Sequence, residues 1–257
     1  MKKALVNGRW QIWLPNSIAD WDAITGDPVA QRGWEYERFE SFRRHLRWDD
    51  SFFDVGAEHG WISAIIAREF VNPEAMVLFE PSPEFWGNIR RTWVHNNIDP
   101  PLACFQGFVA DHSSMVTSFV NADAFDHWPT CADLNAPEVG GMAYRSLANS
   151  SDIPSITLDD FTDVTLYSPS AINIDVEGAE LMVLRGAVGL LTNGTGHLLR
   201  NVWVSIHPDL MENFGHTPEQ LREFMSDAGW MGRHLGTDHE EHWHFERAPF
   251  SAATAST

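Results

Sequence analysis

Hydrophobic positions follow two alternating periods between residues 51 and 230. Short apolar runs, each ended by a glycine, a proline or an acid, predict buried strands at 51–56, 75–81, 102–111, 171–178 and 201–208. Between them, apolar residues at helical spacing predict helices at 61–70, 82–97, 179–191 and 217–229. This alternation of strand and helix predicts an α/β fold, with a mostly parallel sheet covered by helices on both faces.

Capping residues mark where two of these helices begin. Ser82 is expected to be the N-cap of the helix at 82–97, with Pro83 in its first turn. Thr217 and Gln220 have the spacing of a capping box. The segment ITLDDF (156–161) predicts a further strand, and the segments 230–236 and 242–248 predict a closing hairpin.

Two segments do not follow the repeating pattern. Residues 1–50 predict an N-terminal cap that contains an amphipathic helix at 34–46. Residues 112–151 have little periodicity and are long for a connection, so we expect an insertion that helps to bind an acceptor. The main domain is then expected at 51–250, followed by a flexible tail at 251–257.

Charge and composition narrow the classes of partner. The 257 residues carry a formal net charge of −19, from 36 acids against 17 bases. We therefore expect no nucleic acid and no anionic membrane as partner. Two cysteines, Cys104 and Cys131, cannot form a disulfide framework, and no apolar run approaches the ~20 residues of a membrane span. These features, with no clear signal peptide, predict a cytoplasmic protein; they leave its oligomeric state open.

The first candidate site is the glycine turn in FFDVGAEHG (52–60). Gly56 permits backbone angles that are closed to other residues, and Gly60 lets a ligand approach the main chain. The loop lacks the G-x-G-x-x-G pattern of dinucleotide folds, and Asp54 and Glu58 would repel a pyrophosphate. These acids suit a ligand with an ammonium and a sulfonium group, such as S-adenosylmethionine (SAM). The alternative is an ordinary tight turn.

Acids at the next two strand ends extend this candidate site. Glu80 lies where a carboxylate can accept both hydroxyls of a ribose. Its alternative is a solvated glutamate at the end of a strand. Asp111 follows the third strand and is placed to accept the amino group of an adenine.

A second candidate site follows the last two strands of the pattern. Asp175 and Glu177 come directly after one strand, and His207 ends its neighbour, while Glu180 is expected to complement the dipole of the following helix. Asp175, Glu177 and His207 could act together, with His207 as a general base. Alternatively, the three side chains could hold a divalent ion such as Mg²⁺. We favour the base, because no spacing here is diagnostic of a metal site.

The segment HEEHWHFER (239–247) offers further histidines. With a strand period of two, His242, His244 and Glu246 share one face, and Trp243 and Phe245 share the other. This pattern predicts a solvated strand face rather than a metal site.

Four segments carry a family resemblance. DVGAEHGWIS, LFEPSPEFWGNI, ITLDDF and INIDVEGAELMVLRGA, in this order, resemble the FkbM-type SAM-dependent methyltransferases from about residue 52 to residue 230. The resemblance implies a Rossmann-like class I methyltransferase fold with a seven-stranded sheet. It also implies O-methylation of a hydroxyl on a sugar, a glycan or a natural product.

The resemblance also assigns roles to individual residues. The residues implied to bind SAM are Asp54, Gly56, Ala57, Glu58, Gly60, Glu80, Pro81, Ser82, Ala110 and Asp111. Those implied to face the acceptor are Asp175, Glu177 and His207. The family usually has Asn at position 58, often has Lys at position 173 and an acid near position 205; this chain has Glu58, Asn173 and Ser205 there.

Two other functions remain open on the sequence. A nucleotide-linked oxidoreductase would use a similar sheet, although the missing glycine fingerprint disfavours it. A binding module that keeps the fold without turnover would bind SAM and transfer nothing.

Overall fold

The computed structural model describes residues 1–18, 21–26, 32–114, 128–140, 153–192 and 199–247. The predicted tail at 251–257 and most of the predicted insertion at 112–151 lie outside these residues. The two cysteines are free, and Cys104 is buried.

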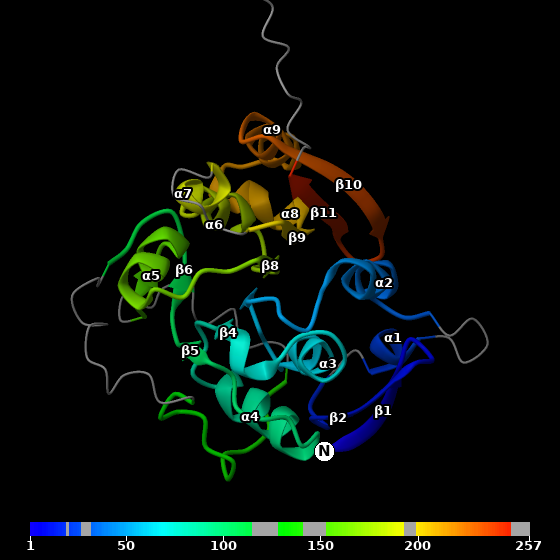
Figure 1. The fold of residues 1–257 in the computed structure, drawn as a ribbon. Coiled ribbons are helices and arrows are strands. Elements are labelled where there is room, and N and C mark those ends of the chain that lie inside the picture. Colours follow the sequence, from blue (N-terminus) through cyan, green and yellow to red (C-terminus); the bar gives the residue numbers. More distant parts are fainter. Residues whose placement is uncertain (19–20, 27–31, 115–127, 141–152, 193–198, 248–257) are drawn as a thin grey trace, which may run out of the picture.

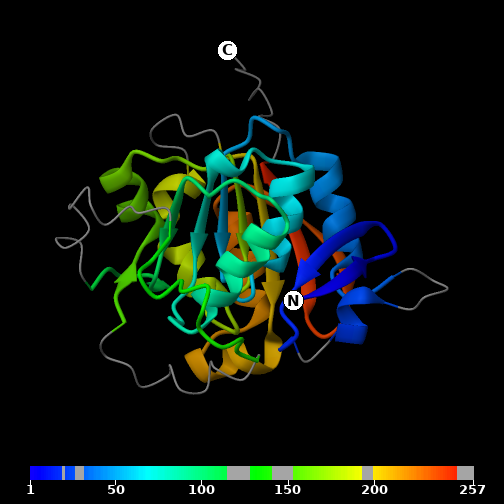
Figure 2. The same cartoon turned by 90° about the horizontal axis from the view of Figure 1, so that it is seen from below.

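A seven-stranded sheet forms the centre of the protein, with the spatial order β10-β11-β9-β8-β3-β4-β5 (Figures 1 and 2). Strands β3, β4, β5, β8 and β9 run parallel, and β11 runs antiparallel to both of its neighbours, β9 and β10. The strands are β3 (Phe52–Val55), β4 (Met76–Phe79), β5 (Ala103–Phe105), β8 (Ala171–Ile174), β9 (Asn201–Ile206), β10 (Trp230–Thr237) and β11 (Glu241–Arg247). The predicted mostly parallel seven-stranded sheet is confirmed.

Helices cover both faces of this sheet, as the alternation predicted (Figure 1). One face packs against α2 (Tyr36–His45), α3 (Trp61–Glu69) and α4 (Phe85–His95). The other packs against α5 (Leu158–Thr165), α6 (Glu180–Arg185), α7 (Val188–Thr192) and α9 (Pro218–Asp227). Along β3, Phe52 lies in the first core and Phe53 in the second, because successive side chains of a strand point to opposite faces.

The N-terminal segment packs onto the first of these cores. A hairpin of β1 (Lys2–Val6) and β2 (Trp10–Leu14) precedes α1 (Trp21–Thr25) and α2. The helix predicted at 34–46 is confirmed as α2, which begins at Tyr36 and buries Phe39 and Phe42. This helix positions two further side chains, Glu35 and Arg38, at the candidate site described below.

Several boundaries differ from the sequence-based expectations. The segment ITLDDF is mostly helix α5 rather than strand, because Thr157 caps the helix by accepting the N–H of Asp160; β7 (Ser155–Ile156) comes before it. The strand predicted at 102–111 is two strands, β5 and β6 (Phe108–Val109), and β6 pairs with β7 in a separate small sheet.

Two predicted helices are also shorter than expected. The helix at 179–191 divides into α6 and α7 at Gly186, where a Cβ atom would lie 2.0 Å from the carbonyl oxygen of Ala110. Helix α4 begins at Phe85 rather than just after Ser82, because the N–H of Ser82 donates to the carboxylate of Glu80. The capping box of Thr217 and Gln220 and the hairpin of β10 and β11 are confirmed.

Candidate active site

The candidate site lies where four parallel strands end at one edge of the sheet. Asp54 lies within β3, and Glu80, Asp175 and His207 directly follow β4, β8 and β9. Carboxyl ends of neighbouring parallel strands are where open α/β sheets bind ligands. The structure therefore brings together the strand-end acids and the histidine that the sequence placed at separate motifs.

The turn after β3 is packed backbone against backbone. Gly56 has a φ of 93°, and a Cβ atom there would lie 1.7 Å from the carbonyl oxygen of Asp175. The N–H groups of Gly56 and Ala57 donate to the carbonyl of Phe79, at the end of β4. Gly60 has a φ of 71° and precedes the first turn of α3. Glycine is thus required at position 56 to bring the ends of β3 and β8 together.

Asp54 is buried and only half satisfied. Its Oδ1 accepts a hydrogen bond from Nδ2 of Asn173 at 2.7 Å. Its Oδ2 accepts no hydrogen bond of normal geometry, although the Ser63 hydroxyl lies near enough to the carboxyl to lower its pKa slightly. Burial raises the pKa of this carboxyl to about 6. An unpartnered buried oxygen at the end of a strand is a ready acceptor for a ligand N–H group.

Glu80 ties two loops together. Its side chain is fully buried; Oε2 accepts the backbone N–H of Glu58 at 3.0 Å, and Oε1 accepts that of Ser82 at 2.8 Å. Pro81 follows directly in the same loop. Glu80 therefore shapes the turn after β3 and the turn after β4 at once.

Asp111 does not follow a strand of the central sheet, contrary to the sequence prediction: it comes after β6, which pairs with β7 in the separate small sheet. The N–H of Ala110 donates to the carbonyl of Ile156, which anchors the segment that follows β6. Asp111 is exposed, and its Oδ1 lies 2.8 Å from Nδ1 of His112. The sequence prediction for Asp111 thus falls on an accessible carboxylate.

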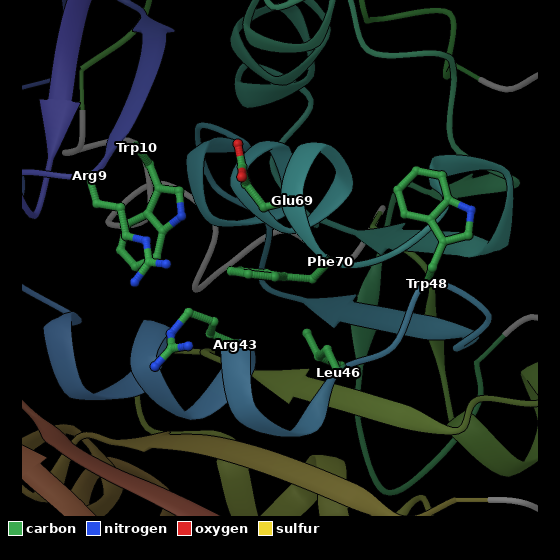
Figure 3. A pocket seen from close by; sticks show the side chains of 7 residues that line it. All are labelled: Arg9, Trp10, Arg43, Leu46, Trp48, Glu69 and Phe70. Carbon is green, nitrogen blue, oxygen red and sulfur yellow. The ribbon is translucent and has the colours of Figure 1, made fainter.

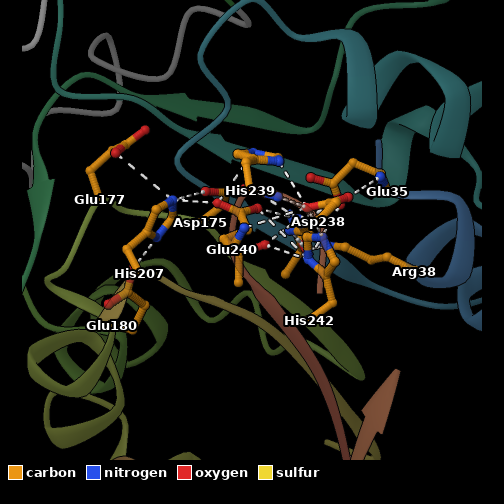
Figure 4. Close-up of polar contacts among 12 residues, drawn as sticks. Glu35, Arg38, Asp175, Glu177, Glu180, His207, Asp238, His239, Glu240 and His242 are labelled. Carbon is orange, nitrogen blue, oxygen red and sulfur yellow. Dashed lines mark hydrogen bonds and ion pairs between the residues drawn. The ribbon is translucent and has the colours of Figure 1, made fainter. Parts of the chain in front are cut away.

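His207 is held among carboxylates (Figure 4). Its Nδ1 donates to Oε1 of the buried Glu180 at 2.7 Å, and its Nε2 hydrogen-bonds Oε2 of Glu240. Oδ1 of Asp175 and Oε2 of Glu177 each lie 3.8 Å from Nε2. Burial opposes the charged form, but the two carboxylate hydrogen bonds outweigh it and raise the pKa of His207 to about 12.

Arg38 crosses from α2 to the sheet and was missed by the sequence analysis. Its guanidinium is buried and donates to Oε2 of Glu35 at 2.8 Å, to Oδ2 of Asp175 at 3.1 Å and to Oδ1 of Asn173. It also donates to the hydroxyl of Ser205. The resemblance had placed a lysine at position 173; here α2 supplies the positive charge at Asn173.

The segment before and within β11 completes the cluster (Figure 4). Nε2 of His242 lies 2.9 Å from Oδ1 of Asp238, and its Nδ1 lies 3.7 Å from both Glu35 and Glu240. Burial opposes ionisation of Glu240, yet contact with His207 lowers the pKa of Glu240 to about 2. Burial raises the pKa of Glu35, whose carboxylate lies between Arg38 and His242.

The prediction of a solvated face for His242 and His244 is wrong. They are 2% and 1% exposed, because α2 packs over this face of β11, whereas Glu246 at its end is exposed as expected. A polar signal was present: Glu35 is the N-cap of α2, and Arg38 lies in its first turn next to the buried Phe39. Charged residues on an apolar helix face indicate a buried polar partner.

Trp34, Trp61 and Trp128 come from the N-terminal segment, from α3 and from the predicted insertion, and they lie in different places. The ring of Trp34 stacks on His239, with 3.9 Å between the centroids. Trp61 is buried against Phe39. Trp128, from the described part of the predicted insertion, packs against Trp93 of α4. Only Trp34 among these three contacts the polar cluster of Figure 4.

A pocket of about 420 Å³ lies away from this site, near the amino end of β3 (Figure 3). It is lined by Arg9, Trp10, Arg43, Leu46, Trp48, Glu69 and Phe70. None of the site acids described above lines it. Within the parts of the chain that the structure describes, no helix is both long and apolar enough to cross a membrane.

Solved structures of methyltransferases share parts of this architecture. A methyltransferase FkbM from Methylobacillus flagellatus KT is 14% identical, over 79% of this chain and 44% of that chain, with a TM-score of 0.45. This chain thus spans less than half the length of that protein. A precorrin-6y C5,15-methyltransferase from Geobacter metallireducens GS-15 is 13% identical, over 92% and 94% of the two chains, with a TM-score of 0.49.

A third structure, of TYW2 from M. jannaschii in complex with AdoMet, is 11% identical, over 86% of this chain and 80% of that chain, with a TM-score of 0.40. No curated protein matches the sequence significantly. None of these similarities carries the assignment, which rests on the family model. The model of the FkbM methyltransferase domain matches residues 54–230, well over half of the chain and including every strand-end residue of the site. The chain belongs to the FkbM methyltransferase family.

Proposed function

We propose that this protein is a SAM-dependent O-methyltransferase that methylates a hydroxyl group of a sugar, a glycan or a natural product. The observation that carries the proposal is the unpartnered Oδ2 of Asp54. Asp54 lies beside the glycine turn after β3, and Asp175 and His207 follow β8 and β9, the next two strands of the sheet. A cofactor site and an acceptor site would then lie on the adjacent strands β3, β8 and β9.

The residues of the turn fit the charged groups of SAM. The ammonium of its methionine part would satisfy Oδ2 of Asp54, which is buried and has no hydrogen-bond partner. Glu80 would accept the ribose hydroxyls, and Asp111 the adenine amino group. SAM supplies an electrophilic methyl group on its sulfonium, which is a good leaving group. The protein must therefore align the acceptor oxygen and remove its proton.

We assign the proton acceptor to Glu177 rather than to His207. Both ring nitrogens of His207 already contact carboxylates, whereas the Glu177 side chain is 49% exposed and within reach of a bound acceptor. His207 would instead orient the carboxylates around it. In this arrangement Asp175 and Glu177 face the acceptor hydroxyl.

The charge of the protein bears on the acceptor class. A net charge of −19, with several carboxylates in the cluster of Figure 4, disfavours phosphate-rich acceptors such as nucleic acids. A neutral acceptor with several hydroxyls carries no such repulsion and can hydrogen-bond to carboxylates. We therefore infer that the acceptor is a glycan or a small molecule. We also propose that the enzyme is cytoplasmic and uses the cellular SAM pool.

Two measurements test the proposal in sequence. Calorimetric titration with SAM and with NAD should give binding of SAM alone; tighter binding of NAD would favour the oxidoreductase. Incubation with methyl-labelled SAM and glycan fractions should then give a labelled methyl ether. SAM binding with no transfer to any glycan or hydroxylated natural-product fraction would favour a binding module that lacks turnover.

A further inference from the structure

The pocket of Figure 3 has the size and the mixed lining of a small-molecule site. Its volume of about 420 Å³ falls within the roughly 300–1,000 Å³ of ligand pockets, which combine apolar rings with a few polar groups. The lining residues come from the β1–β2 hairpin, the end of α2, the end of α3 and the loop before β3. None of the residues that we assign to SAM binding or to proton transfer is among them.

Aromatic rings form the apolar part of this pocket. Trp10 is buried and Phe70 is half-buried, whereas Trp48 is 59% exposed and is the most exposed tryptophan that the structure describes. The carbonyl of Trp48 accepts the N–H of Asn72 at 3.1 Å, which holds the loop in place. An indole held in this way presents a flat apolar face, against which the C–H groups of a ring-shaped ligand can pack.

Two guanidinium groups lie together in the pocket, because one carboxylate holds both (Figure 3). Oε2 of Glu40 accepts from Nε and Nη2 of Arg43 at 3.2 and 2.9 Å, and Oε1 accepts from Nη1 of Arg9 at 3.3 Å. Among the residues that the structure describes, Nη1 of Arg43 and Nη2 of Arg9 make no hydrogen bond. The planar donor groups of two oriented arginines suit a carboxylate or a phosphate.

The charges around the pocket limit how negative its ligand can be. Glu40 neutralises one of the two arginines, so that one positive charge remains beside the rings. Glu69 is the acid that lines the pocket, and Nη2 of Arg68 lies 3.8 Å from its carboxylate. A second anionic group on the ligand would face Glu69, whereas a hydroxyl group could donate to it. These groups therefore fit a ligand with one negative charge and several hydroxyls.

We propose that this pocket binds a sugar unit that carries one carboxylate, as a uronic acid does. The carboxylate accepts hydrogen bonds from Arg9 and Arg43, a hydroxyl group donates to Glu69, and the ring packs against Trp48. The pocket lies near the amino end of β3, whereas the strand-end acids lie at the carboxyl end of the sheet. The bound unit is therefore not the one that is methylated. That both units belong to one glycan acceptor rests on the proposed function, but the binding of the acidic sugar does not.

D-glucuronate and D-glucose test the pocket in the unaltered full chain, because they differ only in the carboxylate at C6. Titration with glucuronate should shift the indole N–H resonance of Trp48 in nuclear magnetic resonance spectra. The resonance is assigned by its absence from the spectrum of Trp48→Phe. Glucuronate should bind at least about tenfold more tightly than glucose, because hydrogen bonds to a charged group are the stronger ones. Tighter binding of AMP than of glucuronate would assign the pocket to a nucleotide instead and overturn the proposal.

Arg44 supplies the matched control, since it is the next residue of α2 and is exposed but does not line the pocket. Arg43→Gln should weaken glucuronate binding at least about tenfold, whereas Arg44→Gln should leave it unchanged. The proposal fails if glucuronate does not shift the Trp48 resonance, if glucose binds as tightly, or if the two variants weaken binding equally. Calorimetry with SAM separates this result from the proposed function. SAM binding without glucuronate binding would overturn the pocket alone, and glucuronate binding without SAM binding would overturn only the proposed function.

Discussion

Asp54→Asn should separate the stability of this protein from its affinity for SAM. The Asp54 carboxyl is 1% exposed, and burial raises its pKa from 3.8 to about 6. Each unit of pKa corresponds to about 1.4 kcal/mol. Ionised Asp54 therefore lowers the free energy of unfolding by about 3 kcal/mol at pH 7. This cost is absent below about pH 4 and grows as the pH rises to about 6.

The substitution exchanges that cost for a smaller one. An asparagine oxygen can still accept from Nδ2 of Asn173, while its amide N–H would lie unpartnered, at a cost of about 1–3 kcal/mol. The variant should thus be as stable as the unaltered protein at pH 7, or up to about 2 kcal/mol more stable. Its SAM affinity should fall about 10- to 150-fold, because a charged hydrogen bond contributes about 1.5–3 kcal/mol.

Asp50 offers the matched control for this experiment. It is equally buried, but it precedes β3 at the opposite end of the strand, where Arg200, Ser170 and the N–H of Arg47 satisfy its oxygens. Asp50→Asn should lower the free energy of unfolding by about 1–3 kcal/mol and leave SAM affinity unchanged. Urea denaturation and calorimetry measure both quantities. Our reasoning is refuted if Asp54→Asn destabilises as much as Asp50→Asn and binds SAM normally.

Three further outcomes can be measured with the same assays. SAM affinity should fall about tenfold between pH 7 and pH 5, because Asp54, with its pKa of about 6, takes up a proton over this range. Asp54→Asn should show no such dependence, and a flat profile for the unaltered protein would contradict this reasoning. Glu80→Gln should weaken SAM binding by about 1.5–3 kcal/mol in calorimetry, and an unchanged affinity would remove Glu80 from the site. Gly56→Ala should prevent folding, because its Cβ would lie 1.7 Å from the carbonyl oxygen of Asp175. Gly215→Ala, with open space around it, should lower the free energy of unfolding by only about 1 kcal/mol. Equal losses of stability in urea denaturation would refute the packing argument.

The part of the fold that local patterns determine could be predicted from the sequence. The five parallel strands and the capping box at Thr217 follow from hydrophobic periods and from capping chemistry within a few residues. The helix α5 was mistaken for a strand because ITLDDF is too short for its period to distinguish the two. The break at Gly186 depends on a carbonyl 76 positions earlier in the sequence, at Ala110, which no local pattern contains.

The candidate site divides in the same way. Asp54, Asp175 and His207 could be placed together because the carboxyl ends of parallel strands meet at one edge. Arg38 and Glu240 could not, because their positions depend on how α2 packs and on where β11 enters the sheet. The polar face of β11 was expected to be solvated for the same reason: its covering helix lies about 200 residues earlier in the chain.

The place of β11 in the sheet has a consequence for how the protein is synthesised. Among the strands that the structure describes, β11 is the last to leave the ribosome, yet it lies between β9 and β10. Until it emerges, β9 presents an unpaired edge and β10 has no neighbour, so the growing chain is exposed to wrong pairing with other nascent chains. Asp238, His239, Glu240 and His242 of the polar cluster follow β10 and emerge just before or within β11. A chain that stops at the end of β10 would therefore lack these four residues as well as the strand that joins β9 to β10.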